Sequence, residues 1–231
     1  MLGFKNGDLT AWQISGTAMM VTSSTTHPAF ADLFHQLFNG YGPVYQYPMY
    51  DGEVRGYKWR LATRLDNSFQ FLLTKSDEAL QRYAADRTKF LSWLAGLVDS
   101  DGHIRISNSS GYTRIGLDIG SVNYCLLGSI RKALSIFGYH ATGPYRGNSS
   151  GFTTPYGITY SRDMWHLYVQ RTKEAQLLVM SLPNKHAEKI AQKEMAVSIR
   201  LPSKWTDNAL KYQKIRETIR EKVSNSKNRP R

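Results

Sequence analysis

The feature that most constrains the fold of this chain is an internal repeat of roughly a hundred residues. A short motif near the N-terminus returns in the middle of the chain, and a Gly-Pro pair and a tryptophan-centred strand follow each copy. Units of this length predict two similar domains related by a pseudo-twofold axis, because the units of a solenoid are shorter. The matching segments are 2–8 with 95–101, Gly42-Pro43 with Gly143-Pro144, and Trp59-Arg60-Leu61 with Trp165-His166-Leu167.

The second copy of the motif, within residues 92–104, is the more complete one. Its apolar residues fall at i, i+3 and i+4, as on one face of a helix, and Gly96 leaves room for a neighbouring backbone. Gly102 is expected to end this helix in the left-handed conformation. Asp101 would then lie at the negative end of the helix dipole, where a carboxylate costs energy unless a cation compensates it. Asp101 is therefore a candidate metal ligand.

The overlay of the two copies pairs Gly3 with Gly96 and Asp8 with Asp101. Two helices packed through these glycines would bring both carboxylates together, and divalent cations would relieve the repulsion between them. Such a site can clamp a scissile phosphate, with one ion activating water and another stabilising the leaving oxygen. The first copy is abbreviated, and it has Leu9 where a glycine is expected, so a left-handed turn there would be costly.

The overall composition points to a partner of opposite charge. The chain of 231 residues has 30 Lys and Arg against 18 Asp and Glu, a formal charge of +12. Such a surplus favours a polyanion, most commonly nucleic acid. No apolar run of membrane-spanning length and no signal-peptide pattern are present, so we expect a soluble, intracellular protein. Cys125, the only cysteine, excludes intramolecular disulfides and is expected to be buried and inert.

Local patterns predict the same order of elements in both halves. In the first half they indicate strands within 10–25, a helix from Pro28, a hairpin around Asp51-Gly52 and two short helices. In the second half they indicate strands at 103–107 and 112–121, a helix over 124–137, a long hairpin and two further helices. From Lys204 the chain has nine basic and three acidic residues, a net charge of 9 − 3 = +6. Asp207 could cap a helix there that is either simply solvated or in contact with flanking DNA.

The nonapeptide LAGLVDSDG at residues 94–102 resembles the signature of the LAGLIDADG homing endonucleases and differs from it at two positions. The layout resembles the monomeric, two-repeat, intron-encoded branch, which is often archaeal or organellar. The resemblance implies an α+β fold of two pseudo-twofold αββαββα repeats, each with a curved antiparallel sheet forming a DNA-binding saddle, and motif helices at the central interface. The expected divisions are a first repeat at 1–89, a second repeat at 90–203 and a basic C-terminal helix and tail at 204–231.

The same resemblance implies a site-specific, double-strand DNA endonuclease that depends on Mg²⁺, with two or three divalent ions. Asp8 and Asp101 would bind the metal with help from the carbonyls of Gly7 and Ser100. The protein would act as a monomer on double-stranded DNA, away from membranes, in an archaeal cytoplasm or an organelle. Two alternatives stay open: an RNA maturase that assists intron splicing and binds intron RNA, and a DNA-binding regulator without catalysis.

The family also places a basic residue and a polar strand-end residue around each active site. Lys185 matches the basic position in the second repeat, and Lys75 would be its counterpart in the first. Ser121 and Ser23 fall where the family often has a glutamine. Their shorter side chains would need an additional water molecule to reach the same place.

DNA contacts are expected from the sheet face opposite the helices. Alternation along the strands selects the side chains that would point to the groove. About half of these contacts should meet phosphates and carry no sequence information. The candidates are Tyr45, Tyr47, His103, Arg105, Ser107, Arg114, Asp118, Arg146 and Asn148.

Overall fold

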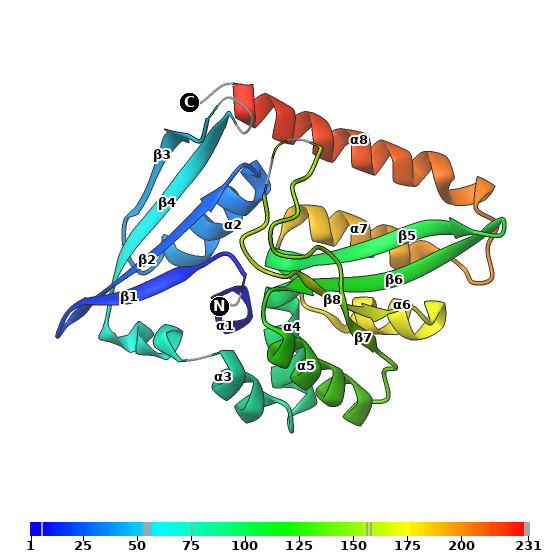
Figure 1. The fold of residues 1–231 in the computed structure, drawn as a ribbon, viewed down its shortest axis with the longest axis horizontal. Coiled ribbons are helices and arrows are strands. Elements are labelled where there is room, and N and C mark those ends of the chain that lie inside the picture. Colours follow the sequence, from blue (N-terminus) through cyan, green and yellow to red (C-terminus); the bar gives the residue numbers. More distant parts are fainter. Residues whose placement is uncertain (6, 53–55, 75, 156, 158, 229–231) are drawn as a thin grey trace.

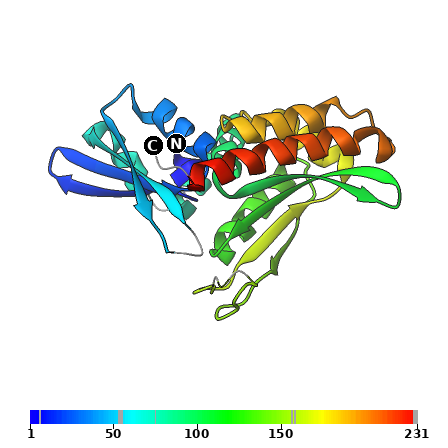
Figure 2. The ribbon, with the colours of Figure 1, turned by 90° about the horizontal axis from the view of Figure 1, so that it is seen from above.

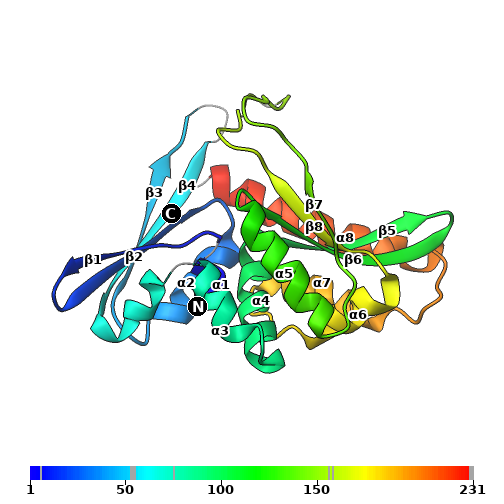
Figure 3. The same ribbon diagram turned by 60° about the horizontal axis from the view of Figure 1, so that its bottom comes forward.

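A computed structural model describes residues 1–5, 7–52, 56–74, 76–155, 157 and 159–228. Its architecture is α+β, with two four-stranded antiparallel sheets on either side of the central helices α1 and α4 (Figure 1). The first sheet has the strand order β1-β2-β4-β3, and the second has the order β5-β6-β8-β7. The two orders are the same once the numbering is shifted, which confirms the expected repeat of the fold. The sheets splay apart on opposite sides of the molecule (Figure 3).

The first half is built around phenylalanines of one helix that pack on the sheet. Phe30, Phe34 and Phe38 fall on the buried face of α2, against a core that includes Met19 and Leu61 of the sheet. This half comprises α1 Leu2–Lys5, β1 Thr10–Ser15, β2 Ala18–Thr25, α2 Pro28–Phe38, β3 Val44–Tyr50, β4 Tyr57–Asp66, the 3₁₀ helix η1 Asn67–Leu73 and α3 Ser76–Tyr83.

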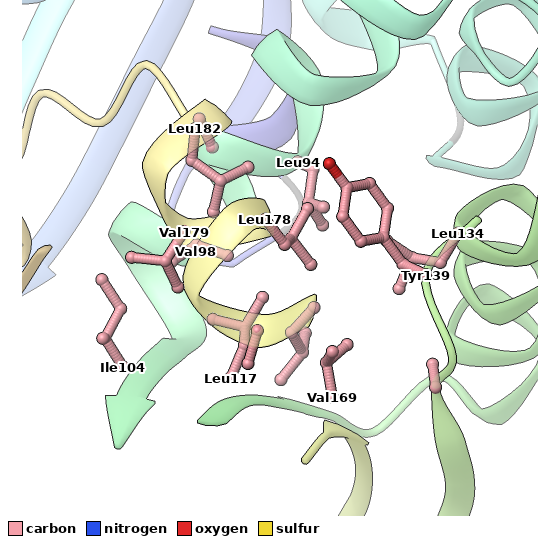
Figure 4. Packing of buried hydrophobic residues seen from close by; sticks show 14 of the residues in the cluster. Leu94, Val98, Ile104, Leu117, Leu134, Tyr139, Val169, Leu178, Val179 and Leu182 are labelled. Carbon is pink, nitrogen blue, oxygen red and sulfur yellow. The ribbon is translucent and has the colours of Figure 1, made fainter. Parts of the chain in front are cut away.

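The second half has the larger core, to which α4 contributes one face. Figure 4 shows Leu94 and Val98 of α4 in the same cluster as Ile104 and Leu117 of the sheet. Asp86 begins α4 by accepting a hydrogen bond from the backbone N–H of Lys89 at 3.0 Å, as N-cap carboxylates do. The elements are α4 Arg87–Asp101, β5 Gly102–Ser109, β6 Tyr112–Ser121, α5 Tyr124–Ile136, β7 Thr142–Arg146, β8 Trp165–Val169, α6 Thr172–Ser181 and α7 Ala187–Ser198.

The last helix, α8 Thr206–Asn228, lies along the long axis of the molecule. It starts at the outer end of β5 and β6, where Trp205 donates a backbone hydrogen bond to Gly111, and it runs back toward the first half (Figure 2). Tyr212 is buried against the second core. Within the described parts of the chain, no helix combines the length and apolarity needed to cross a membrane.

Two expectations about single residues are wrong. Gly102 has φ −83° and ψ 158°, an extended conformation, so glycine is needed there for space: a Cβ would come within 2.6 Å of the Val98 Cα. Leu9 is accordingly under no left-handed strain, because Ser110 is the one described non-glycine residue with positive φ. Cys125 is exposed. It lies beside the buried stripe of α5, which runs through Leu126, Leu127 and Ile130.

Candidate active site

The two motif helices meet through their glycines. A Cβ on Gly3 would overlap the carbonyl oxygen of Trp93, and a Cβ on Gly96 would lie 2.8 Å from the backbone nitrogen of Phe4. The backbones of α1 and α4 therefore approach more closely than any side chain would allow. This contact holds the four-residue α1 against α4 and brings the ends of both helices to one place.

Asp8 and Asp101 are neighbours at that place. A Cβ on Gly7 would lie 2.5 Å from Oδ2 of Asp101, so the loop before Asp8 touches the second carboxylate. Both aspartates remain open to solvent on one side. Loss of hydration, followed by the charge of Asp8, raises the pKa of Asp101 to about 7, and loss of hydration also raises the pKa of Asp8. The geometry thus places the two carboxylates close enough for the charge of Asp8 to disfavour ionisation of Asp101.

Lys189 is the basic residue that the sequence reasoning missed. Its Nζ donates a hydrogen bond of 2.5 Å to the carbonyl of Gly102, the residue after Asp101. Burial lowers the pKa of Lys189, and its charge acts on both Asp8 and Asp101. The sequence did contain a signal: Lys189 precedes the buried residues Gln192 and Ala196 by three and seven positions, on one face of α7.

Of the two lysines predicted for the site, only Lys185 lies within the described residues. The side chain of Lys185 is exposed, and its backbone N–H donates to Oδ2 of Asp99 at 2.8 Å. Lys75 lies outside the described residues. The role proposed for Lys185 stays a prediction.

Asp99, in the middle of the motif, makes hydrogen bonds that stabilise the position of α4. It is 5% exposed, and it accepts hydrogen bonds of 2.8 Å from Nδ2 of Asn184 and from the backbone N–H of Lys185. These bonds join the C-terminal turn of α4 to the connection between α6 and α7. Asp99 therefore fixes the helix that carries Asp101.

A polar contact between the halves lies next to this site. Nδ1 of His27, just before α2, is 3.4 Å from Oε2 of Glu188 on α7. His186 packs against Phe30 of the first half, and burial lowers the pKa of His186 to about 4. The histidine is thus neutral near pH 7. These contacts link α2 and α7 behind the two aspartates.

The two predicted serines have different surroundings. Ser23 is buried, and its Oγ donates a 2.7 Å hydrogen bond to the carbonyl of Asp8. Ser121 accepts a bond from the backbone N–H of Asn123 at 3.1 Å, near the start of α5. Ser121 also lines a pocket with Gly7 and Asp101. Ser23 therefore positions the first aspartate, whereas Ser121 lies at the wall of the space beside the second.

The groove face of the second sheet is polar, as predicted. The register pairs His103 with Asp118, Arg105 with Gly116 and Ser107 with Arg114, all opposite to the buried side of Ile104 and Ile106. His103 and Asp118 line the same pocket as Asp101, together with Asn148. Burial is the main cause that lowers the pKa of His103, and the charges of Lys189, Arg105 and Arg216 act in the same direction.

One predicted groove residue lies on the other face. Arg146 pairs in register with Trp165, and its guanidinium lies 6.0 Å from the centroid of that ring and 3.6 Å from the carboxylate of Asp163. Trp165 contacts Tyr124 at the start of α5, so this is the helix side of the sheet. The neighbouring Tyr145, opposite His166, takes the groove position, because the register of β7 shifts before it.

The groove face of the first sheet is more aromatic. Tyr45 and Tyr47 lie opposite Ala62 and Arg60, on the face away from the core, and are 59% and 50% exposed. Trp12 pairs with Met20 and is 42% exposed. Both predicted tyrosines therefore occupy the expected face.

The oxygen ligands available where α1 and α4 meet suit a hard divalent cation. Mg²⁺ is commonly bound by one or two carboxylates, with water and substrate phosphate oxygens completing its shell. Asp8 and Asp101 provide two carboxylates, and the loop of Gly7 and the turn of Ser100 lie against each other beside them. No cluster of three or more His, Cys, Asp or Glu residues occurs within the described residues. The arrangement fits a site that is completed by its substrate.

Comparisons with known proteins agree with this geometry. Residues 90–180 match the family described as LAGLIDADG-like domain. Among curated proteins, none matches the chain. The homing endonuclease I-WcaI bound to its DNA recognition sequence has a TM-score of 0.55 at 10% identity over 83% of each chain. Full-length DUF199/WhiA from Thermatoga maritima has a TM-score of 0.52 at 17% identity, covering 93% of this chain and 65% of that chain. Residues 90–180 thus form a LAGLIDADG-like domain, and the chain has the two-repeat fold of the single-chain LAGLIDADG homing endonucleases.

Proposed function

We propose that this chain is a site-specific DNA endonuclease that hydrolyses both strands with divalent metal ions, preferably Mg²⁺, at the crossing of α1 and α4. The observation that carries the proposal is the pair Asp8 and Asp101, held side by side between two sheets with polar groove faces. The DNA-bound state of I-WcaI, which shares the fold, supports DNA as the substrate.

The division into repeats at 1–89 and 90–203, with a C-terminal segment at 204–231, belongs to the same proposal. Each repeat would supply one sheet to the DNA and one aspartate to the shared centre. One chain then carries both halves of the active site, so a monomer is sufficient.

The carboxylates of Asp8 and Asp101, with the carbonyls of Gly7 and Ser100, would hold the ions. When bound, divalent ions supply an activated water and stabilise the leaving oxygen. The chain itself fixes the carboxylates: Ser23 holds the Asp8 carbonyl, and Asp99 anchors the end of α4. The protonated form of Lys189 favours the ionised forms of both aspartates.

We assign the basic role beside this centre to Lys189. Its Nζ is hydrogen-bonded to the carbonyl of Gly102. The ammonium group is close enough to Asp8 and Asp101 for their charges to interact. Since the side chain is half-buried and its Nζ is bonded to Gly102, it acts by positioning the carboxylates and by biasing their charge. The side chain of Lys185 is exposed, and the described contact of this residue with the motif is the backbone bond to Asp99.

The decisive experiment is cleavage of plasmids that carry intron-free genomic fragments of the host, with Mg²⁺ and EDTA lanes compared. Linear product that forms with Mg²⁺, is absent with EDTA and is lost in Asp101→Asn would support the proposal. Specific DNA binding without cutting in any divalent metal would favour a regulator. Stimulated splicing of an intron RNA without DNA cutting would favour a maturase.

A further inference from the structure

The helix α8 covers the free edge of the second sheet. Strand β5 is the edge strand of that sheet, and Ile106, Ser107 and Asn108 share a pocket with residues of α8. Apolar residues attach the helix to the second core. Tyr212 is buried there, and the ring of Trp205 packs edge-on against the Tyr212 ring, with 6.4 Å between the ring centroids. This attachment fixes one flank of α8 next to β5.

That flank carries two arginines one helical turn apart. Arg216 and Arg220 are exposed and line the pocket beside Ser107 and Asn108. The guanidinium of Arg216 is 5.8 Å from the centroid of the Tyr212 ring. This contact holds the guanidinium close to the surface of the helix. Arg216 and Arg220 therefore present two charges to the same side of β5.

The acidic residue in this pocket is hydrogen-bonded to another residue of the helix. Glu217 lines the same pocket, but its Oε1 accepts a 2.7 Å hydrogen bond from Nε2 of Gln213. Among the described residues, the ion pairs of the chain include neither Arg216 nor Arg220. Both guanidinium groups thus remain available for an anion.

The basic surface continues from the sheet onto the helix. On the groove face, a second pocket is lined by Arg105, Arg114, Ser107 and Asn108. Ser107 and Asn108 therefore belong to both pockets, so the groove and the flank of α8 meet across a single strand. A polyanion lying on the groove face would reach the two arginines of α8 without leaving the surface.

We infer that Arg216 and Arg220 form a phosphate-binding track, which holds one backbone of duplex DNA along the edge of the second sheet while the groove face contacts the bases. This inference rests on the proposed function, because it assumes a DNA duplex on the groove face. The contact is independent of sequence, since guanidinium groups on an exposed helix flank meet phosphates rather than base edges. The helix thereby adds affinity and fixes the duplex beside the active site.

The test compares two double variants of the full chain by fluorescence anisotropy with a mixed-sequence DNA duplex, in Ca²⁺, over a range of salt concentrations. Arg216→Gln with Arg220→Gln removes the track. Lys211→Gln with Lys222→Gln is the matched control, because these exposed residues lie on the other side of the buried face of the same helix. Circular dichroism melting checks that both variants fold.

We expect the arginine variant to lower the slope of log K against log[salt] by about two, roughly one for each lost phosphate contact, and the lysine variant to change it by less than half of that. Equal losses in both variants would show a general charge effect and overturn the inference. An unchanged slope in the arginine variant would also overturn it, as would a loss seen with an RNA duplex and not with DNA.

The outcome for the wild type separates this inference from the proposed function. A protein that binds DNA with the expected arginine dependence but never cuts it would overturn the proposed nuclease and leave the track standing. A protein that cuts DNA with an unaltered arginine slope would overturn the track alone. A wild type without DNA binding would overturn both.

Discussion

The two motif helices reach the same crossing with very different lengths. α4 has fifteen residues, and its apolar face belongs to the second core, whereas α1 has four residues, of which Phe4 is buried in the first core and Gly3 lies against Trp93. The two aspartates therefore follow helices of very unequal length. One helix is a rigid scaffold, and the other docks on it.

The immediate surroundings of the two aspartates differ in the same sense. On the Asp101 side, Lys189 holds the carbonyl of Gly102, and Asp99 ties the helix to Asn184. On the Asp8 side, the hydroxyl of Ser23 donates to the Asp8 carbonyl, and the charges of His27 and Lys189 favour the ionised carboxylate. The two aspartates thus share Lys189 but differ in their other contacts.

The groove faces also differ between the two sheets. Both faces carry arginines, Arg60 and Arg64 on the first sheet and Arg105 and Arg114 on the second, and the first adds the exposed rings of Trp12, Tyr45 and Tyr47. Arginine can read guanine through two hydrogen bonds in the major groove, whereas aromatic rings offer apolar surface to base methyl groups. Apolar contacts should accordingly contribute more to reading the half-site on the first sheet.

The largest expected effect tests whether the two aspartates are equivalent. Asp101→Asn and Asp8→Asn should each reduce double-strand cleavage by about a thousandfold or more, because groups that act as one unit fail together. Duplex binding in Ca²⁺ should persist, and Asp207→Asn on α8 serves as the control. Near-normal cleavage by Asp8→Asn would show that the first helix is only a scaffold.

A smaller loss in cleavage rate should follow from removing the charge of Lys189, which acts on both aspartates. Lys189→Met should slow cleavage by about a hundredfold, the scale of a positioned proton-transfer or charge-stabilising group, and should shift the pH profile of cleavage. Lys185→Met, on the same segment but exposed, should cost little. Single-turnover rates over a pH series measure both, and equal losses in the two variants would contradict the assignment to Lys189.

The close contact between α1 and α4 can be tested by measuring the stability of glycine variants. Gly96→Ala should lower the free energy of unfolding by about 2 kcal/mol, because the new Cβ meets the backbone of α1. Gly128→Ala is the matched helical control: open space surrounds its Cβ, and it should stabilise by up to about 1 kcal/mol. Urea unfolding compares them, and equal destabilisation by both would argue against the close helix crossing.

The smallest expected effect concerns the free energy of unfolding, which the ionised Asp101 lowers. Since the pKa of Asp101 is raised to about 7 in the folded state, its contribution to stability is present at low pH and lost as the pH rises through that value. Asp101→Asn removes this cost and should raise the melting temperature by roughly a few degrees near pH 8, and by less near pH 5.

That comparison cancels the opposite influence of the histidines. The lowered pKa values of His103 and His186 destabilise the fold at acid pH, but they are present in both proteins. A melting-temperature gain that is larger at acid pH would contradict the raised pKa of Asp101. Metal-free buffer is required, because a bound cation would itself stabilise the wild type.

Much of the fold could be predicted because its signals are local. The order of strands and helices follows from alternation, helical spacing and capping residues such as Asp86 and Asn123. Gly3 and Gly96 predicted a close helix crossing, and the structure confirms it. The face of His103, Arg105 and Ser107 followed from the side-chain period of two along a strand.

The failures occurred where a residue depends on neighbours that are remote in sequence. Arg146 was assigned to the groove by position, but a register shift in β7 gives that place to Tyr145. Lys189 was overlooked because only the packing of α7 against β5 brings its ammonium group to the aspartates. Gly102 was correctly expected to be special, but the reason is the Val98 backbone rather than a left-handed turn.

The sequence by itself determined the repeated order of elements, the paired aspartates and the positive charge. These properties depend on local backbone preference, on periodic burial and on residue identity, each of which acts within a few neighbouring positions. Only the tertiary structure decided which lysine lies beside the carboxylates, which face each edge residue takes and where α8 lies. Those features depend on contacts between segments that are remote in sequence, such as Lys189 and Gly102, which are 87 residues apart, and α8 with β4 of the first half.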